Sequence, residues 1–263
     1  MVFLLGYVYA FSTVQEHRSQ AQLFAQFRGL LDPASVIGPP LGGHITSDTP
    51  VALISVPALH LSQVVVVEGT TSGDLAQGPG HQSNSPLPGQ VGQSILMGKA
   101  VSYGAPFAGL AQLRRGVLIT ATTGQGTFHF HVEDVRVAGS RLPVIPANAS
   151  LLTLISTSQA GLFGASAASH LIYVDAALVG TPAPTPSGAP TTVSLAEVQG
   201  HSDSGAWPWV VCWSVLLVVA VALAMVLARR WGVRRTWLVA TPTLLLAAWC
   251  LSGQVMRLLP NVY

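Results

Sequence analysis

Two long apolar segments near the C-terminus constrain this chain more than any other feature. Residues 207–227 contain no charged side chain, and a second apolar segment covers residues 236–259. A helix rises 1.5 Å per residue and the hydrocarbon core of a bilayer is about 30 Å thick, so about 20 apolar residues span it. Both segments meet that length, and the sequence predicts a transmembrane helical hairpin over residues 207–259.

The composition of the whole chain agrees with this assignment. Half of the residues are hydrophobic and only 8% are charged, against about a quarter in a typical soluble domain. The formal net charge of +2 is too small to indicate a nucleic-acid-binding protein. The two cysteines, Cys212 and Cys250, lie inside the apolar segments. A disulfide framework or a cysteine-based metal site is therefore excluded for the rest of the chain.

The N-terminal residues form another membrane-related region. Residues 1–14 are apolar and uncharged, and as a helix they would extend about 21 Å. They lack the basic start and the small-residue cleavage motif of a secretory signal peptide, so we expect an uncleaved anchor helix. Residues 15–31 continue as a stalk helix, with Leu23 and Phe27 at helical spacing. The sequence thus predicts an anchor and stalk over 1–31 and a Pro- and Gly-rich linker over 32–48.

Arginines between the two C-terminal segments indicate the orientation in the membrane. Four of them lie in this short connection (Arg229, Arg230, Arg234 and Arg235). Cytoplasmic loops carry an excess of Lys and Arg, so we expect the connection on the cytoplasmic side. The region between the N-terminal anchor and the hairpin is then extracytoplasmic.

The central region, residues 49–180, has the pattern of a compact β domain. Short runs rich in β-branched residues alternate with Gly and Pro, as in strands separated by turns. The expected strands cover seven runs (51–56, 64–67, 94–97, 117–122, 127–138, 151–155 and 171–177). Two of them form a hairpin across Gly124 and Gly126. Seven or eight strands in about 130 residues can enclose their own core, and residues 181–206, rich in Pro, Ser and Thr, follow as an extended linker.

Several segments of this β domain resemble the sortases, and among them the class E type of high-GC Gram-positive bacteria. Residues 64–81 (VVVVEGTTSGDLAQGPGH) match a strand followed by the EGTT, DL and GPGH elements of the family. Residues 87–93 (LPGQVGQ) precede a strand, and residues 103–113 (YGAPFAGLAQL) resemble a family helix. The resemblance covers about residues 44–180. It implies a mainly β protein with a sortase-like β-barrel outside the plasma membrane of a Gram-positive, actinobacterial cell.

The residues that would carry sortase chemistry are replaced in this chain. A sortase is a cysteine transpeptidase in which a histidine acts as acid and base and an arginine steadies the substrate or the oxyanion. By resemblance, the histidine falls on Lys99, the cysteine on Thr157 and the arginine on His170. All three positions differ from the functional pattern. The resemblance therefore implies a sortase fold with no expected catalytic residue, and we expect neither a metal nor a cofactor.

A second chemistry stays open at the same positions. Lys99 could act as a base for a hydroxyl group of Thr157, Ser156 or Ser158. Burial would have to lower the pKa of Lys99 by several units from about 10.4, because a threonine hydroxyl is not ionised near neutral pH and needs a positioned base. The other interpretation of Lys99 is a solvated or structural cation in a disused groove.

The histidines of the β domain are expected to be exposed or structural. His129 and His131 alternate along one strand and share a face, with Glu133 next on the same side. Three successive positions on one face spread along the strand, so Glu133 is a poor third metal ligand and we expect the histidines to face solvent. His81, in the glycine-rich turn, is expected to be structural.

These observations lead to one main functional hypothesis and two alternatives. The main hypothesis is a membrane-anchored, catalytically inactive sortase-like protein that acts as an extracytoplasmic binding or assembly subunit. Its partners would be the membrane and other integral membrane or cell-envelope proteins. The first alternative is an acyl hydrolase or transpeptidase that uses the Ser/Thr–Lys pair. The second is a module that binds a cell-wall or sorting-signal-like peptide without cleaving it.

Overall fold

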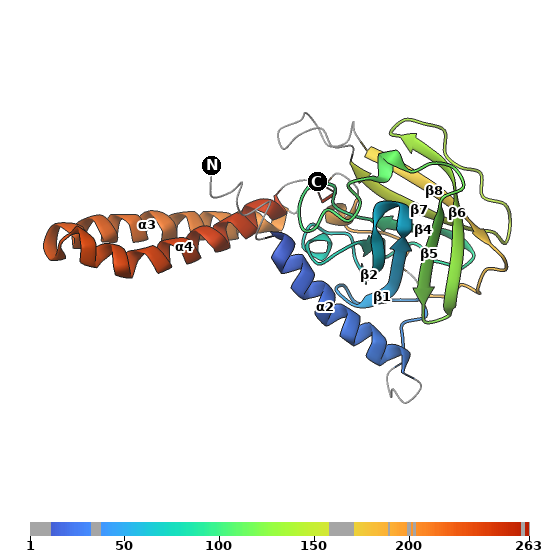
Figure 1. Cartoon of the computed structure of the whole chain (residues 1–263), viewed down its shortest axis with the longest axis horizontal. Helices are drawn as coiled ribbons and strands as arrows, with labels where there is room; N and C mark the ends of the chain where they lie inside the picture. Colours follow the sequence, from blue (N-terminus) through green and yellow to red (C-terminus); the bar gives the residue numbers. More distant parts are fainter. Residues whose placement is uncertain are drawn as a thin grey trace.

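The computed structural model describes residues 12–32, 38–157, 171–188, 190–198, 201, 204–258 and 261–262. A β-barrel forms the main body, and the long helix α2 (Ser12–Leu31) lies against it. A helical hairpin projects from the same body (Figure 1).

Eight strands close the barrel in the described part of the chain, in the order β1-β2-β3-β4-β7-β8-β6-β5. Their bounds are Pro50–Val56 (β1), Leu61–Glu68 (β2), Gly80–His81 (β3), Gly92–Met97 (β4), Leu118–Thr123 (β5), Gly126–Val137 (β6), Ser150–Thr157 (β7) and Leu171–Val179 (β8). Most neighbours are antiparallel, but β2 pairs with β3, and β4 with β7, in parallel. The predicted mainly β class with two C-terminal apolar helices is confirmed, whereas residues 1–11 of the predicted N-terminal anchor lie outside the described residues.

The barrel encloses one main hydrophobic core. Large side chains of most of its strands are fully buried there, among them those of Ile54, Val66, Leu96, Phe130 and Leu152. Strand β6 has many exposed positions, as expected for a strand with one face in water. Strand β7 is instead buried at every position. Its outer face must therefore be covered by other parts of the chain.

The two-residue strand β3 was not among the expected strands. It pairs in parallel with β2 and antiparallel with β4, and so closes the barrel between them. Gly80 has to be a glycine, because a Cβ atom there would lie 2.1 Å from the carbonyl oxygen of Gly69. A glycine-rich turn without β-branched residues gives no strand signal in a sequence, which explains why this strand could not be predicted.

Residues 103–113 do not form the helix that the family resemblance implied. They form turns and one short 3-10 helix, Leu110–Gln112. Tyr103 and Ala105 have positive φ angles, which are incompatible with a continuous right-handed helix. Phe107 nevertheless reaches the barrel core and is fully buried.

Helix α2 is not a free-standing stalk but packs on the barrel. Leu23 and Phe27 are buried, and Leu23 contacts the apolar face of β2. Gln20 Nε2 donates to the carbonyl oxygens of Val65 (3.0 Å) and Gln77 (2.8 Å), and Gln20 Oε1 accepts from the Val65 amide (2.8 Å). This side chain therefore completes the backbone hydrogen bonding of β2 at Val65.

The Pro-rich segment expected as a linker, residues 181–206, runs along the barrel in its described part. The amide of Ala183 donates to the carbonyl oxygen of Gly89 at 2.8 Å, and its carbonyl oxygen accepts from the Val91 amide at 3.1 Å. Thr185 Oγ1 donates to the carbonyl oxygen of Val91 at 2.8 Å. The composition indicated the extended backbone, but not that it adds hydrogen bonds to the barrel.

Helices α3 (Trp207–Trp231) and α4 (Val233–Arg257) form the hairpin. Within them, Trp207–Arg230 and Thr236–Val255 are long and apolar enough to cross a membrane. Pro242 lies inside α4. The connection between the helices lies far from the barrel, whereas the other ends of both helices lie next to it (Figure 1). This arrangement suits a membrane hairpin with the barrel on one side of the bilayer.

Candidate functional site

Two parallel strands bring two of the predicted site positions to one edge of the barrel. Strands β4 and β7 pair with Met97 opposite Ile155, and parallel strands end at the same edge of a sheet. The Gly98 amide continues the pairing by donating to the Ile155 carbonyl oxygen at 3.0 Å. Lys99, just after β4, and Thr157, at the end of β7, therefore leave the sheet side by side.

Lys99 is fully buried at this edge. Its Nζ donates to the main-chain carbonyl oxygen of Asn261 at 3.2 Å and lies 5.5 Å from the centre of the Tyr103 ring. No carboxylate is paired with it in the part of the chain that the structure describes. Burial without a counter-charge lowers the pKa of Lys99 to about 7. Lys99 is therefore not solvated, and of the interpretation as a solvated or structural cation only the structural half stays open.

Thr157 and Ser156 end strand β7 at the same edge, and both are buried. Thr157 Oγ1 donates to the carbonyl oxygen of Val262 at 3.3 Å. Ser156 Oγ donates to the carbonyl oxygen of Gly98 at 2.8 Å and so ties the ends of β4 and β7 together. The other two predicted positions, Ser158 and His170, lie outside the described residues.

The ends of β4 and β7, with Lys99 and Thr157, form an edge that we call the groove, and the described part of the C-terminal segment, Asn261 and Val262, lies against it. Asn261 and Val262 are fully buried. Their successive carbonyl oxygens accept the hydrogen bonds from Lys99 and Thr157. The side chain of Val262 belongs to one apolar cluster (Leu75, Met97, Ile155 and Leu171). This C-terminal segment is part of the cover over the end of β7.

Asn261 is held through both its side chain and its main chain. Its Nδ2 donates to the carbonyl oxygens of Thr70 at 2.8 Å and of Val198 at 3.2 Å. Its amide donates to the carbonyl oxygen of His201 at 2.9 Å. Thr70 lies in the turn after β2, and the other two acceptors lie in the segment before α3. Segments far apart in the sequence therefore meet at one asparagine.

The hydrogen bonds decide what this edge can do chemically. A lysine with a pKa of about 7 has the proton affinity of a general base at neutral pH. A base and a nucleophile work together only when they share a hydrogen bond, but Lys99 and Thr157 each donate to the C-terminal segment. With that segment in place, Lys99 and Thr157 donate to neighbouring carbonyl oxygens and do not form an assembled base–nucleophile pair.

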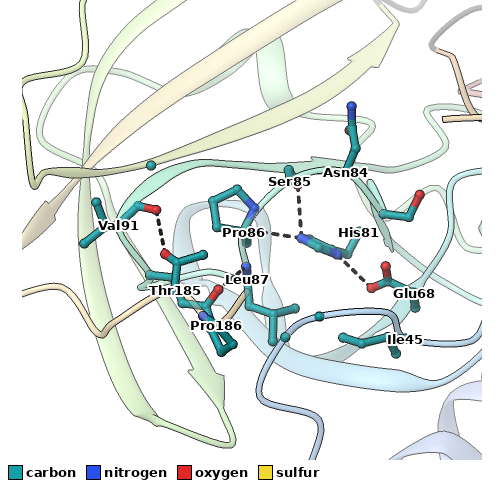
Figure 2. A pocket seen from close by; sticks show the side chains of 15 residues that line it. Ile45, Glu68, His81, Asn84, Ser85, Pro86, Leu87, Val91, Thr185 and Pro186 are labelled. Carbon is teal, nitrogen blue, oxygen red and sulfur yellow. Dashed lines mark hydrogen bonds and ion pairs between the residues drawn. The ribbon is translucent and has the colours of Figure 1, made fainter. Parts of the chain in front are cut away.

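A second cluster of polar side chains lines a pocket of about 260 Å³ beside β3. His81 Nδ1 lies 2.8 Å from Glu68 Oε2, and His81 Nε2 lies 3.1 Å from Ser85 Oγ. Figure 2 shows the imidazole between the carboxylate and the serine. In space, Ser85, His81 and Glu68 follow one another in the order of a Ser–His–acid triad.

The hydrogen-bond partners argue against a nucleophilic Ser85. His81 Nε2 also faces the carbonyl oxygen of Pro86 at 3.1 Å; a carbonyl only accepts, so Nε2 carries a proton. A triad needs this nitrogen unprotonated toward the serine. Ser85 Oγ already donates to the Gln82 carbonyl oxygen at 2.8 Å and accepts from the Ile95 amide at 3.2 Å. We assign the cluster a structural role.

A third polar cluster lies on β6, β7 and β8. Arg136 forms a buried ion pair with Asp175, and Arg136 Nη2 donates to Asp175 Oδ1 at 3.2 Å. Thr153 Oγ1 donates to the same oxygen at 2.7 Å, and the guanidinium lies 4.7 Å from the centre of the Tyr173 ring. Arg136, Thr153 and Tyr173 border a pocket of about 320 Å³ that also includes Ile155. Ile155 belongs as well to the apolar cluster around Val262.

The histidines considered as metal ligands face solvent. His129, His131 and Glu133 are exposed on β6. Among the described residues, there is no group of three or more His, Cys, Asp and Glu side chains that could hold a metal ion.

The sequence-based analysis did not identify Asn261, Val262, Glu68 or Arg136. For Glu68 a usable signal exists, because an acid that ends a run of four valines requires a buried partner. The C-terminal residues carry no such signal. They follow an apolar helix, and only the three-dimensional structure shows that they return to the barrel.

The fold and this edge define a class of protein: a closed β-barrel domain with a peptide-filled groove, joined to a hairpin of membrane type. Residues 54–174 match the family model described as the sortase domain. This part of the barrel is therefore similar to the sortase domain, as the sequence motifs indicated.

The chain is also similar to solved sortases. A Clostridium perfringens sortase D5 transpeptidase is 19% identical with a TM-score of 0.48, covering 62% of this chain and 99% of the other. Sortase A from Corynebacterium diphtheriae is 20% identical with a TM-score of 0.44, covering 64% and 92%. A sortase E variant from Streptomyces avermitilis is 25% identical with a TM-score of 0.41, covering 52% and 92%. No curated protein matches the chain.

Proposed function

We propose that this chain is a membrane-anchored, catalytically inactive sortase-like protein that serves as an extracytoplasmic binding or assembly subunit of a membrane or cell-envelope complex. In this proposal, residues 49–180 form the extracytoplasmic domain and residues 207–259 the membrane hairpin. The cell is of the Gram-positive, actinobacterial type that class E sortases suggest. The partners are integral membrane or envelope proteins.

One observation supports this proposal: the chain's own C-terminal segment contacts Lys99 and Thr157, the positions to which the sequence resemblance assigns the catalytic groups of a sortase. Lys99 and Thr157 both donate hydrogen bonds to that segment. The cysteines, Cys212 and Cys250, lie in the apolar helices. A threonine hydroxyl without a hydrogen-bonded base cannot replace a thiolate as nucleophile.

The membrane part supports a role in a complex. The two apolar helices expose most of their surface, and the most apolar part of Trp207–Arg230 has no residue buried within this chain. One anchor at the N-terminus would hold a domain at the surface, so a further hairpin provides helix faces for lipid or for partner helices. These faces are the binding surfaces that the assembly hypothesis needs.

The experiment that tests the proposal has two arms. The full-length protein is purified from its native membranes under mild conditions, and the proteins that elute with it are identified. In parallel, the purified protein is incubated with internally quenched peptides that carry sorting-signal-like sequences. The proposal expects reproducible partner proteins and no peptide cleavage. A monomer without partners, or turnover of a peptide, would contradict it.

A second candidate function is favoured by the lowered pKa of Lys99, about 7. In this alternative the C-terminal segment leaves the groove, and Lys99 acts as base for the hydroxyl group of Thr157 or Ser156 in an acyl hydrolase or transpeptidase. An acyl group from a peptide ester probe would then accumulate on the protein, as seen by intact mass. Its loss in Lys99→Ala would support the enzyme, and no acylation of either protein would exclude it.

A further inference from the structure

The C-terminal segment is bound by features that are specific for its residues. Its two carbonyl oxygens accept hydrogen bonds from Lys99 and Thr157, which the main chain of any sequence could do in the same conformation. The Asn261 side chain adds two donated hydrogen bonds, to Thr70 and Val198. These two acceptors are main-chain carbonyl oxygens that need an N–H donor, so an aspartate could not replace this asparagine.

The next residue is selected by shape and polarity. Val262 is fully buried in the cluster that contains Leu75, Met97 and Ile155. A charged side chain at this position would lose its hydration without gaining a partner. The groove thus combines a site for an asparagine with an adjoining site for a small aliphatic side chain.

The segment before α3 completes the site from outside. Thr70 Oγ1 donates to the carbonyl oxygen of Glu197 at 2.8 Å, and Ser83 Oγ donates to Glu197 Oε2 at 2.7 Å. Val198 and His201 then supply two of the acceptors for Asn261. The segment before α3 therefore contacts the segment after α4.

The short connection between α4 and Asn261 couples the position of the helix to the binding of Asn261. Helix α4 ends at Arg257, so only three residues separate its end from Asn261. An extended chain spans at most about 3.6 Å per residue. Asn261 can therefore stay in the groove only while the end of α4 lies close to the barrel.

We infer that the groove is a binding site for an Asn-Val segment, and that the chain's own C-terminal segment is its resident ligand, closing the groove and fastening the α3–α4 hairpin to the barrel. Release of the segment opens the groove to an outside peptide and frees the hairpin to change its position. The inference deepens the proposed function by naming what occupies the groove. It holds whether the open groove only binds peptides or also acts on them.

The test uses the fact that Lys99 is the only lysine of the chain. The full-length protein in detergent micelles is treated with an amine-acylating reagent, and the acylated peptide is identified by mass spectrometry. Lys99 of the wild-type protein is expected to react slowly. In Asn261→Ala, which loses both side-chain hydrogen bonds, labelling should be faster by roughly tenfold or more. Val262→Asp should give the same result.

Asn84→Ala is the matched control, because Asn84 is exposed and lies outside the groove. Its labelling rate should equal that of the wild type. Equal labelling of the wild type, Asn261→Ala and Val262→Asp would overturn the inference. Loss of Lys99 protection in Asn84→Ala as well would overturn it too, since protection would then depend on overall stability and not on the segment.

A second measurement asks whether the site accepts the segment in trans. A chain that ends at Leu258 is mixed with a synthetic peptide of residues 257–263 (RLLPNVY), and binding is measured by fluorescence anisotropy. The peptide should bind the shortened chain and not the full-length protein, and its Asn261→Ala analogue should bind at least about tenfold more weakly. Equal binding of both peptides would contradict the proposed selectivity.

The labelling result separates this inference from the proposed function. Peptide turnover by a protein whose Lys99 becomes accessible only in Asn261→Ala would remove the inactive-subunit proposal and keep the C-terminal segment as the ligand of the groove. Copurifying partners together with an unprotected Lys99 would keep the inactive-subunit proposal and remove the C-terminal segment as the ligand of the groove.

Discussion

The side chain of Lys99 donates a hydrogen bond to the main-chain carbonyl oxygen of Asn261, 162 positions away, at 3.2 Å. Both residues are fully buried. A lysine buried without a paired carboxylate is destabilising in its charged form, so the burial of Lys99 lowers the free energy of unfolding by an amount that depends on pH. This pH dependence tests whether Lys99 is buried in solution.

The first prediction concerns Lys99→Met. Burial lowers the pKa of Lys99 from 10.5 to about 7. Between pH 7 and pH 10.5, Lys99 is therefore protonated in the unfolded chain and neutral in the folded chain. The free energy of unfolding of the wild type should therefore rise with pH in this window, by at most about 5 kcal/mol. Below pH 7 the penalty is fully present. Lys99→Met should remove the slope and be more stable than the wild type at pH 6.

The measurement for Lys99→Met is pulse proteolysis of the full-length protein in detergent micelles, over a urea series at pH 6 to 10. Arg114→Met is the control, because Arg114 is an exposed cation and its loss should leave the slope unchanged. A Lys99→Met protein with the same pH slope as the wild type would show that Lys99 is charged and hydrated in the folded state.

The second prediction concerns Gln20, which joins α2 to β2. Gln20→Ala removes three hydrogen bonds with Val65 and Gln77, and should lower the free energy of unfolding by about 2 kcal/mol. Hydrogen exchange should show the Val65 amide becoming less protected. Gln26→Ala, at an exposed position of the same helix, should have no such effect. Equal exchange at Val65 in both variants would mean that α2 does not lie on β2 in solution.

The fold could be predicted where local pattern and tertiary environment agree. The hairpin of β5 and β6 was predicted because half-exposed strands alternate in polarity and Gly124 and Gly126 mark the turn. Strand β3 could not be predicted, because its glycine is required by a close approach to Gly69 and not by any local strand preference. The docking of α2 also depends on the barrel surface and not on the helix sequence alone.

The candidate site was predictable only in part, and the reason is the distance between its components in the sequence. The order of the motifs placed Lys99 after one strand and Thr157 at the end of another, and parallel pairing brings these ends together. Nothing in the local sequence indicates that Asn261 and Val262 fill the groove between them. The state of Lys99, buried instead of solvated, follows from those distant residues.

The third prediction tests the structural role of the cluster around His81. Glu68→Leu keeps a similar volume but leaves His81 Nδ1 without its acceptor in a buried site. It should lower the free energy of unfolding by about 3 kcal/mol, measured by pulse proteolysis in urea. Ser85→Ala removes one hydroxyl group and should cost only about 1 kcal/mol. If Ser85→Ala instead abolished an acyl-transfer activity of the purified protein, Ser85 would be a nucleophile and the structural assignment would be wrong.

The fourth prediction tests the orientation of the hairpin. In a cysteine-free background (Cys212→Ala and Cys250→Ala), Arg230→Cys places a thiol next to the connection of α3 and α4, and Ser140→Cys places one on the exposed loop after β6. Three arginines remain in the connection, so the charge bias that holds it in the cytoplasm is kept. A membrane-impermeant maleimide added to intact cells should label Ser140→Cys, and Arg230→Cys only after the membrane is permeabilised. Labelling of Arg230→Cys in intact cells would place the connection outside, and the barrel, which lies at the opposite end of the hairpin, would then have to face the cytoplasm.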